Sequence, residues 1–203
     1  MMAAFMVGIL IPVVFIYLKE KLQYQIENRN DVEKLTNIPI LAELPKSDSS
    51  PSNIGSIVIH ENKNNIMEEA FRTLRTNLLF MVEADKKVIL ITSSRPGEGK
   101  SFVSGNLAVS LAFLGKKVII VGLDIRKSGL DRVFGFKSQL NGITNYLSNP
   151  EENKLSDLII SSGISPNLDI LPRGIIPPNP TELIARPTLE KAIDELKKKY
   201  DII

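Results

Sequence analysis

The sequence predicts an α/β fold in which helices flank a parallel sheet, with a transmembrane helix in front of it. Two apolar runs, Lys87–Thr92 and Lys117–Val121, are rich in β-branched residues and have the length of buried strands. A glycine-rich turn and a segment with helical spacing of its apolar residues lie between them. Parallel neighbouring strands need a crossover of this kind, so the order strand, helix, strand indicates a parallel sheet.

Residues 1–18 carry no charge and predict the transmembrane helix. At about 1.5 Å per residue this stretch is about 27 Å long, just short of a hydrocarbon core of about 30 Å. The cations that follow it place its C-terminal side in the cytoplasm: Lys19, Lys21 and Arg29. A signal peptide would need a cationic start and a small-residue cleavage site, which this stretch lacks. A buried core helix is the other alternative.

A juxtamembrane segment and linker are predicted over residues 19–56. The part from Lys46 to Ser56 is rich in Ser and Pro, which is typical of a flexible linker. His60, the only histidine, is expected in a loop and receives no role.

The next segment, Asn64–Val82, is predicted to be a helix. Its apolar residues at four-residue intervals are expected to share one face: Ile66, Ala70, Leu74 and Leu78. Glu69, Arg72 and Arg75 recur every three residues on another face. By itself such a trio is more often a solvated charged stripe than a site.

The glycine-rich turn is the strongest functional signal in the chain. Residues 93–101 read Ser-Ser-Arg-Pro-Gly-Glu-Gly-Lys-Ser, a P-loop-like pattern between a strand and a helix. The glycines let backbone N–H groups surround phosphates at a helix N-terminus, so we expect ATP or GTP to bind here. We expect Lys100 to reach the β- and γ-phosphates and the Ser101 hydroxyl to hold Mg²⁺. The residues expected to contact the nucleotide are Pro96, Gly97, Glu98, Gly99, Lys100, Ser101 and Phe102.

One position departs from the strict pattern, which has glycine where this chain has Ser94. The alternative is a tight strand-to-helix turn that carries Lys-Ser by chance. The strand-like and helix-like flanks favour the phosphate site.

Asp124 follows the second predicted strand at the edge of the sheet where open α/β proteins bind ligands. It is expected to hold the water shell of the metal or to accept a proton from an attacking hydroxyl. An Asp in a turn after a buried strand is the alternative. The distance of about one crossover from the turn favours the functional interpretation.

Later segments predict a helix near Gly142–Leu147, a helix near Leu155–Ser161, a strand at Leu168–Leu171 and a helix at Thr188–Lys199. A hydrophobic content of 43% is sufficient to bury a core. The net charge of +2 is too small to indicate nucleic acid as a partner. The chain has no cysteine, which excludes disulfides and thiolate metal sites.

Together these motifs resemble the bacterial tyrosine kinases that regulate capsule and exopolysaccharide export, P-loop proteins related to the MinD/ParA ATPases. Residues 69–75 fit that family's Glu-x-x-Arg-x-x-Arg motif. Residues 168–174, followed by Pro-Pro-Asn-Pro-Thr-Glu-Leu at 177–183, resemble another of its segments. The resemblance covers residues 31–203, and residues 31–41 are similar to the family's juxtamembrane segment.

The resemblance implies an ATP-dependent protein-tyrosine kinase that uses Mg²⁺ and phosphorylates a tyrosine on a neighbouring subunit. It implies catalytic roles for Lys100 and Asp124, with Asp124 and Ser101 at the metal, and an orienting role for Arg126. The residues that it implies as contacts in a homo-oligomeric ring are Glu69, Arg72 and Arg75. It further implies the polysaccharide export and polymerisation machinery as a partner, and an inner-membrane location with the catalytic domain in the cytoplasm.

The expected domains are a transmembrane helix at residues 1–18, the linker at 19–56 and a kinase domain at 57–203 that stops before its Walker B strand. The family usually has Asp-x-Asp-x-Arg after the second strand, whereas here Gly122 replaces the first acid. On these grounds we expect the chain to be a fragment with weak or absent activity by itself.

Two other functions remain open. A MinD/ParA-type ATPase would use water as the acceptor and usually has a second lysine early in the P-loop, where this chain has Arg95. A non-catalytic membrane scaffold that controls polysaccharide chain length would bind nucleotide only as a switch.

Overall fold

The computed structural model describes residues 2–22, 26, 28–46, 56–61, 65–83, 85–127, 129–136 and 141–203. The chain divides into two compact units, Met1–Ile40 and Leu41–Ile203. Most of the predicted linker at Lys46–Ser56 lies outside the described residues. The three predicted domains therefore stay a prediction.

The first unit holds helices α1 (Met2–Leu22) and α2 (Arg29–Leu35). A helix was expected at α1, and it extends beyond the uncharged stretch. Across the described residues, no helix has both the length and the apolarity that crossing a membrane requires. The transmembrane prediction is therefore not confirmed. The sequence did not predict α2, whose first turn is capped by the Asn28 side chain.

The second unit is built on a three-stranded sheet in the order β1-β3-β2. Strand β1 (Val118–Val121) runs parallel to β3 (Leu168–Leu171), as predicted, with Val118 opposite Leu168. Strand β2 (Ile160–Ser161) was not predicted, and it pairs with β3 in the antiparallel direction, so the sheet is parallel at β1–β3 but not throughout. The connection from β2 to β3 is a short turn, and a short turn can only reverse the chain.

The run Lys87–Thr92 was predicted to be a strand, and it is not one in this structure. Its first residues do pair with the C-terminal residues: Ile89 N–H donates to Ile203 O at 2.8 Å, and Ile203 N–H donates to Lys87 O at 2.7 Å. On the other side, Ile119 N–H donates to Ile202 O at 3.0 Å. Residues 202–203 thus lie between the run and β1. A strand requires a partner along its length, and this partner meets only the beginning of the run.

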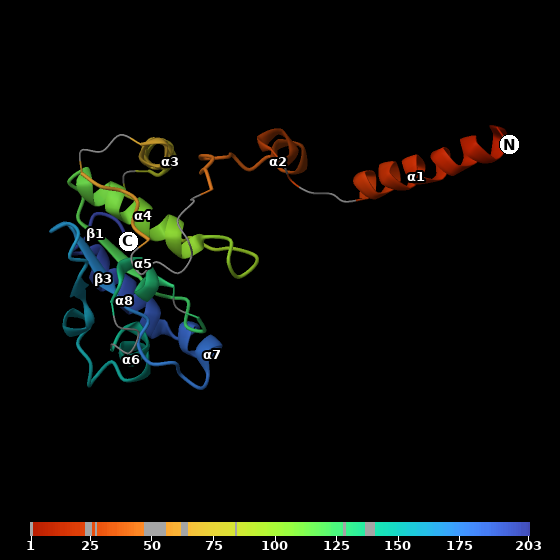
Figure 1. Cartoon of the computed structure of the whole chain (residues 1–203). Helices are drawn as coiled ribbons and strands as arrows, with labels where there is room; N and C mark the ends of the chain where they lie inside the picture. Colours follow the sequence, from red (N-terminus) through yellow and green to blue (C-terminus); the bar gives the residue numbers. More distant parts are fainter. Residues whose placement is uncertain are drawn as a thin grey trace. The chain divides into compact units, whose positions relative to one another are not determined.

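The helices of this unit cover both faces of the sheet (Figure 1). Their bounds are α3 (Ile66–Met81), α4 (Lys100–Phe113), α5 (Leu130–Phe134), α6 (Ile143–Ser148), the 3₁₀ turn η1 (Leu155–Leu158), α7 (Pro180–Ile184) and α8 (Pro187–Lys197).

Successive side chains of a strand point to opposite faces of the sheet, and this alternation produces two hydrophobic cores. Val118 and Ile120 point to the side of α3 and α4, whereas Ile119 points to the side of α6, α7 and α8. Tyr200 packs on this second side, and its hydroxyl donates to Asp169 Oδ2 of β3 at 2.7 Å. The sheet is thereby shielded on both faces, which leaves the loops at the ends of its strands for function.

The buried face of α3 differs from the one predicted. Phe71, Leu74 and Leu78 are buried, whereas Ile66 is 81% exposed. An α-helix has 3.6 residues per turn, so each step of four residues moves the side chain by about 40° around the helix axis. Repeated steps add up, so Ile66 does not share the buried face of Leu78.

Residues 155–161 were predicted to be a helix, and they form η1 followed by β2. Leu155 and Leu158 are buried one 3₁₀ turn apart, and Ile160 pairs with β3. Pairing with β3 outweighs the short helical pattern. The helices α3, α4, α6 and α8 were predicted, and α5 and α7 were not.

Candidate nucleotide-binding site

The predicted phosphate loop leads directly into α4, as the sequence indicated. Gly97 and Gly99 both have φ of +90°, a backbone conformation that favours glycine, and Gly99 is the N-cap of α4. A Cβ placed on either glycine would meet nothing within 4 Å, so the space over the loop is open. No side chain caps the first turn of α4. Its N–H groups and the positive end of the helix dipole therefore suit an anion.

Glu98 stabilises this loop from within. Its carboxylate accepts hydrogen bonds from the Arg95 N–H at 3.0 Å and from the Ser94 hydroxyl at 3.1 Å. The Arg95 backbone N–H is the main reason why the pKa of Glu98 lies below its ordinary value, with the Ser94 hydroxyl second. Ser94, where the strict pattern has glycine, thus has a structural partner. In this structure the Glu98 side chain holds the loop.

Lys100 and Asp124 meet where the start of α4 approaches the loop that follows β1. The Lys100 ammonium lies 2.5 Å from Asp124 Oδ2, and the two side chains are 32% and 29% exposed. Burial would raise the pKa of Asp124, but hydrogen bonds from Lys100 and the Lys127 N–H outweigh it, and the net pKa is lowered. Asp124 is therefore a carboxylate at neutral pH. Two residues predicted from separate motifs are in contact.

Ser101 and Asp124 supply the oxygens that suit Mg²⁺. A hydroxyl and one carboxylate are typical protein ligands of a magnesium ion whose remaining positions are filled by water and phosphate oxygens. The described residues contain no group of three or more His, Cys, Asp or Glu side chains that could hold a metal by themselves. The donor set thus fits Mg²⁺ that arrives with a nucleotide.

Gly129 leaves the room that the Ser101 hydroxyl occupies. A Cβ at Gly129 would lie 2.5 Å from Ser101 Oγ and 2.9 Å from its Cβ. Gly129 could not be predicted from the sequence, because its contact with the loop exists only after α4 and α5 pack together.

Arg126 is exposed, and with Asp124 it borders a cavity of about 340 Å³. One wall of the cavity is residues 123–126, and the other is α7 with Pro180, Thr181, Ile184 and Ala185. Phe102 contributes only its backbone to the loop, since its ring packs on Phe71 with centroids 5.9 Å apart. Pro96 is exposed in the loop.

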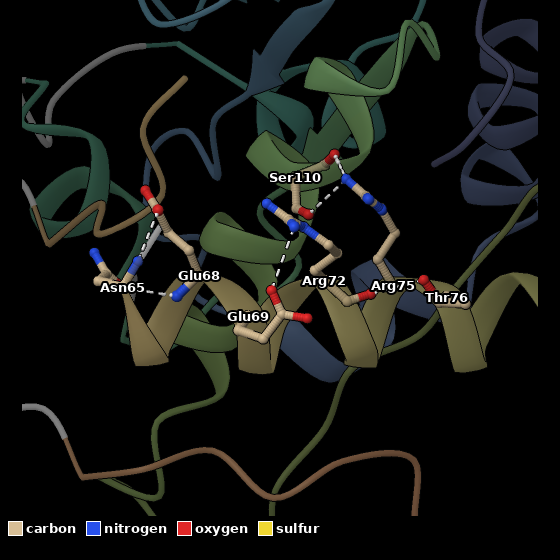
Figure 2. Close-up of polar contacts among 7 residues, drawn as sticks. All are labelled: Asn65, Glu68, Glu69, Arg72, Arg75, Thr76 and Ser110. Atoms are coloured by element: carbon tan, nitrogen blue, oxygen red, sulfur yellow. Dashed lines mark hydrogen bonds and ion pairs between the residues drawn. The ribbon is translucent and has the colours of Figure 1, made fainter. Parts of the chain in front are cut away.

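The charged trio on α3 is divided between two surroundings (Figure 2). Glu69 and Arg72 form an ion pair of 3.3 Å, with side chains 65% and 51% exposed. Arg75 reaches α4 instead, and its Nη1 donates to the carbonyl oxygen of Ser110 at 2.9 Å and to the Ser110 hydroxyl at 3.2 Å. Burial, with the nearby Arg72 charge, lowers the pKa of Arg75. The three residues do not present one common surface.

Two buried polar residues, neither of them predicted from the sequence, hold the segment before α3. Asn106 of α4 is fully buried, and its side chain accepts from the Val58 N–H at 2.8 Å and donates to Ser56 O at 3.1 Å. Glu68 is 5% exposed, and it accepts from the His60 N–H at 2.9 Å while it forms a capping box with Asn65. A polar residue within the apolar pattern of α4 was the available signal for Asn106, because a buried amide needs partners.

Comparisons with known proteins find similar sequences and a similar fold. The model of an AAA domain matches residues 86–203. A relative from Klebsiella pneumoniae, named for a tyrosine-protein kinase in the cps region, is 32% identical across the whole chain. The tyrosine-protein kinase CpsD of Streptococcus agalactiae is 39% identical over 67% of the chain. The solved kinase domain of Escherichia coli tyrosine kinase ETK has a TM-score of 0.77 with 28% identity, and the match covers 88% of this chain and 71% of that one.

The chain spans only part of these relatives. It covers 29% of the length of the Klebsiella relative and 58% of the Streptococcus relative.

Proposed function

Because the chain belongs to an AAA-domain family, and within it to the bacterial tyrosine kinases of capsule and exopolysaccharide biosynthesis, we propose that it binds MgATP and phosphorylates tyrosine. The observation that carries this proposal is the contact of Lys100 with Asp124 at the open N-terminus of α4. A cation and a carboxylate then lie together where the phosphates would bind.

In the proposed mechanism the backbone N–H groups of residues 97–102 donate to the β- and γ-phosphates. The Lys100 ammonium moves from Asp124 to the phosphates and stabilises the charge on the transferring group. When bound by Ser101 and by Asp124 through water, Mg²⁺ supplies further positive charge at the same phosphates.

Asp124 is left without its ion pair when Lys100 turns to the phosphates, so it can accept a hydrogen bond from the acceptor hydroxyl. Even an ordinary aspartate, with a pKa of about 4, is a weak base toward a phenol with a pKa of about 10. We therefore assign Asp124 mainly to orientation of the hydroxyl and of the metal's water. Arg126 would orient groups at the rim of the same site.

The cavity beside Asp124 supports tyrosine as the acceptor. Its α7 wall includes the aliphatic side chains of Pro180, Ile184 and Ala185, which suit an aromatic ring. A phenol seated there would have its hydroxyl near Asp124. The acceptor itself would belong to a neighbouring subunit of a homo-oligomeric ring.

We extend the proposal to the surroundings of the enzyme. The exposed Glu69 and Arg72 would contact the next subunit, and the uncharged residues 1–18 would anchor the protein in the inner membrane with the catalytic unit in the cytoplasm. The polysaccharide export and polymerisation machinery would be its partner. Cell fractionation tests the anchor, because recovery of the protein in the soluble fraction would contradict it.

The central test is Lys100→Met in the full-length protein, with Lys116→Met as the control. Lys116 is an exposed lysine beyond the other end of α4. After incubation with ATP and Mg²⁺, we expect phosphotyrosine to fall at least about 100-fold in Lys100→Met, because the transferring phosphoryl loses its main cation. Lys116→Met should match the parent. Equal phosphotyrosine in Lys100→Met and the parent would refute the proposed function.

A further inference from the structure

We infer that Arg75 is a positioning residue of the nucleotide site, which ties α3 to the P-loop helix α4 within one subunit. This role differs from that of Glu69 and Arg72 in the same sequence motif, and it rests on nucleotide binding as proposed above. The basis is the pair of hydrogen bonds from Arg75 to Ser110, at 2.9 Å and 3.2 Å.

The Ser110 carbonyl belongs to the last turn of α4, where backbone carbonyls lack partners within the helix. The neighbouring carbonyls of this turn are used locally: Leu111 O accepts from the Leu114 N–H at 3.1 Å, and Ala112 O accepts from the Gly115 N–H at 3.0 Å. Arg75 donates a hydrogen bond to the Ser110 carbonyl oxygen, and Ser110 is only 4% exposed. Since the C-terminal end of a helix carries partial negative charge, a guanidinium is well suited to this position.

Helix α3 also holds α4 near its other end. The ring of Phe71, which is fully buried, packs edge-on against the ring of Phe102 at 5.9 Å. Phe102 directly follows Ser101, the residue proposed to hold Mg²⁺. The Phe71 and Arg75 contacts therefore fix the position of α4 on both sides of its midpoint. A helix of 14 residues is a rod about 21 Å long, so a shift at Ser110 is transmitted to the loop.

Phe71 and Arg75, the two residues that contact α4, each lie within one helical turn of Glu69 or Arg72. Glu69 and Arg72 are mostly exposed and pair with each other, whereas Arg75 reaches Ser110 of α4 (Figure 2). Phe71 is buried and contacts Phe102 of α4. A displacement of α3 caused by binding at Glu69 and Arg72 would therefore be transmitted to the P-loop through the Phe71 and Arg75 contacts. Because coupling between two sites is reciprocal, nucleotide binding would alter the same surface.

The experiment compares four variants at a concentration where sedimentation velocity shows a monomer. Arg75→Ala removes the tie, and Arg75→Lys keeps its charge but loses the planar fork. Arg72→Ala is the control on the same helix. Tyr200→Phe removes a half-buried hydrogen bond on the opposite side of the sheet, so it controls for a general loss of stability.

Two quantities are measured: the Kd of a fluorescent ATP analogue, and hydrogen exchange of residues 100–106 without nucleotide. We expect Arg75→Ala to bind the analogue about fivefold more weakly, the lower end of typical coupling between sites, and to exchange faster at residues 100–106. Arg75→Lys should recover part of both effects. Arg72→Ala and Tyr200→Phe should match the parent in both.

The proposal is overturned if Arg75→Ala leaves both quantities unchanged while the parent binds the analogue. It is also overturned if Tyr200→Phe, at an equal loss of melting temperature, changes both quantities as much as Arg75→Ala does. If the parent itself fails to bind the analogue, the proposed function fails. Hydrogen exchange of residues 100–106 then still tests whether Arg75 holds α4 in place. Should Arg75→Ala not fold, Arg75→Lys and Ser110→Ala provide the same comparison with a smaller expected change.

Discussion

Asp124 illustrates how neighbouring groups set the charge of a single side chain. Partial burial raises its pKa, and the Lys100 ammonium and the Lys127 N–H lower it by more. The folded-state pKa is thus below the ordinary value of 3.8. The carboxylate therefore contributes stability that is present above that value and is lost as the pH falls through the folded pKa.

At this scale we predict the pH dependence of Asp124→Asn. Near neutral pH the variant should be less stable by about 1 kcal/mol, because a partly exposed ion pair with good geometry is lost. Below about pH 4 the difference from the parent should shrink, since the Asp124 carboxylate takes up a proton first in the unfolded parent and, at lower pH, in the folded parent. Thermal unfolding from pH 7 to pH 3 measures this.

Asp194→Asn provides the comparison, because Asp194 is an exposed carboxylate of α8 with a similar ion pair to Lys197. It should show a much smaller difference at every pH. A difference for Asp124→Asn that stays constant down to pH 3 would contradict the ion pair.

The elements around the site are held by a loop that follows β3. Gly174 in this loop has φ of +94°, and a Cβ there would collide with the Thr144 hydroxyl and lie 2.6 Å from Asn145 Oδ1 of α6. Thr144 also donates to Ile175 O at 2.7 Å. A Cβ at Gly122, after β1, would lie 2.9 Å from the N–H nitrogen of Arg173. The ends of β1 and β3 thus lie against each other and against α6.

At the scale of these elements we predict that Gly174→Ala destabilises the protein by about 3 kcal/mol, because it adds a left-handed backbone penalty and a collision. Gly163→Ala is the matched variant. Gly163 also has a positive φ, of +69°, but a Cβ there meets nothing within 4 Å. It should lose only about 1 kcal/mol.

Urea denaturation of both variants gives the two free energies of unfolding. Equal losses would show that close packing at Gly174 adds nothing to the backbone penalty, which would contradict the role given to the loop.

Across the whole molecule, the α3 trio divides into an exposed pair, which we propose for assembly, and Arg75, which contacts α4. Arg72 and Glu69 form the exposed part, and the ion pair between them is only 3.3 Å long. The guanidinium of Arg72 is planar with several donors, so it can rearrange to face a carboxylate of another subunit. We therefore expect assembly to depend on Arg72 more than on Arg75.

We predict that Arg72→Glu lowers the sedimentation coefficient of the assembled protein, because the exposed face of α3 would then carry two like charges at Glu69 and position 72. The Kd of the ATP analogue for the dissociated subunit should be unchanged. Arg132→Glu, an equal change of charge at an exposed position of α5, should leave the sedimentation profile as in the parent. An unchanged profile for Arg72→Glu would refute the subunit contact.

The backbone of the glycine-rich loop could be predicted because its signals are local. Gly97, Gly99 and Lys100 form a short pattern whose backbone conformation and place before a helix follow from glycine and from helix termini. Asp124 was expected near the loop because it follows a parallel strand at the edge of the sheet where ligands bind, and the structure adds its contact with Lys100. The helices α3 and α4 were predicted from periodicity, and α6, β3 and α8 were predicted more coarsely.

Other features depend on which residues the fold brings together, and no local pattern contains that information. Local patterns were enough to predict the glycine-rich loop before α4, the order of the main elements and the family, because each depends on residues close together in the chain. The tertiary structure decided that Arg75 bonds to Ser110, that Gly129 makes room for Ser101 and that β2 runs antiparallel to β3. The physical reason is that burial, steric fit and strand pairing are properties of surfaces in contact, and those surfaces exist only once the chain has folded.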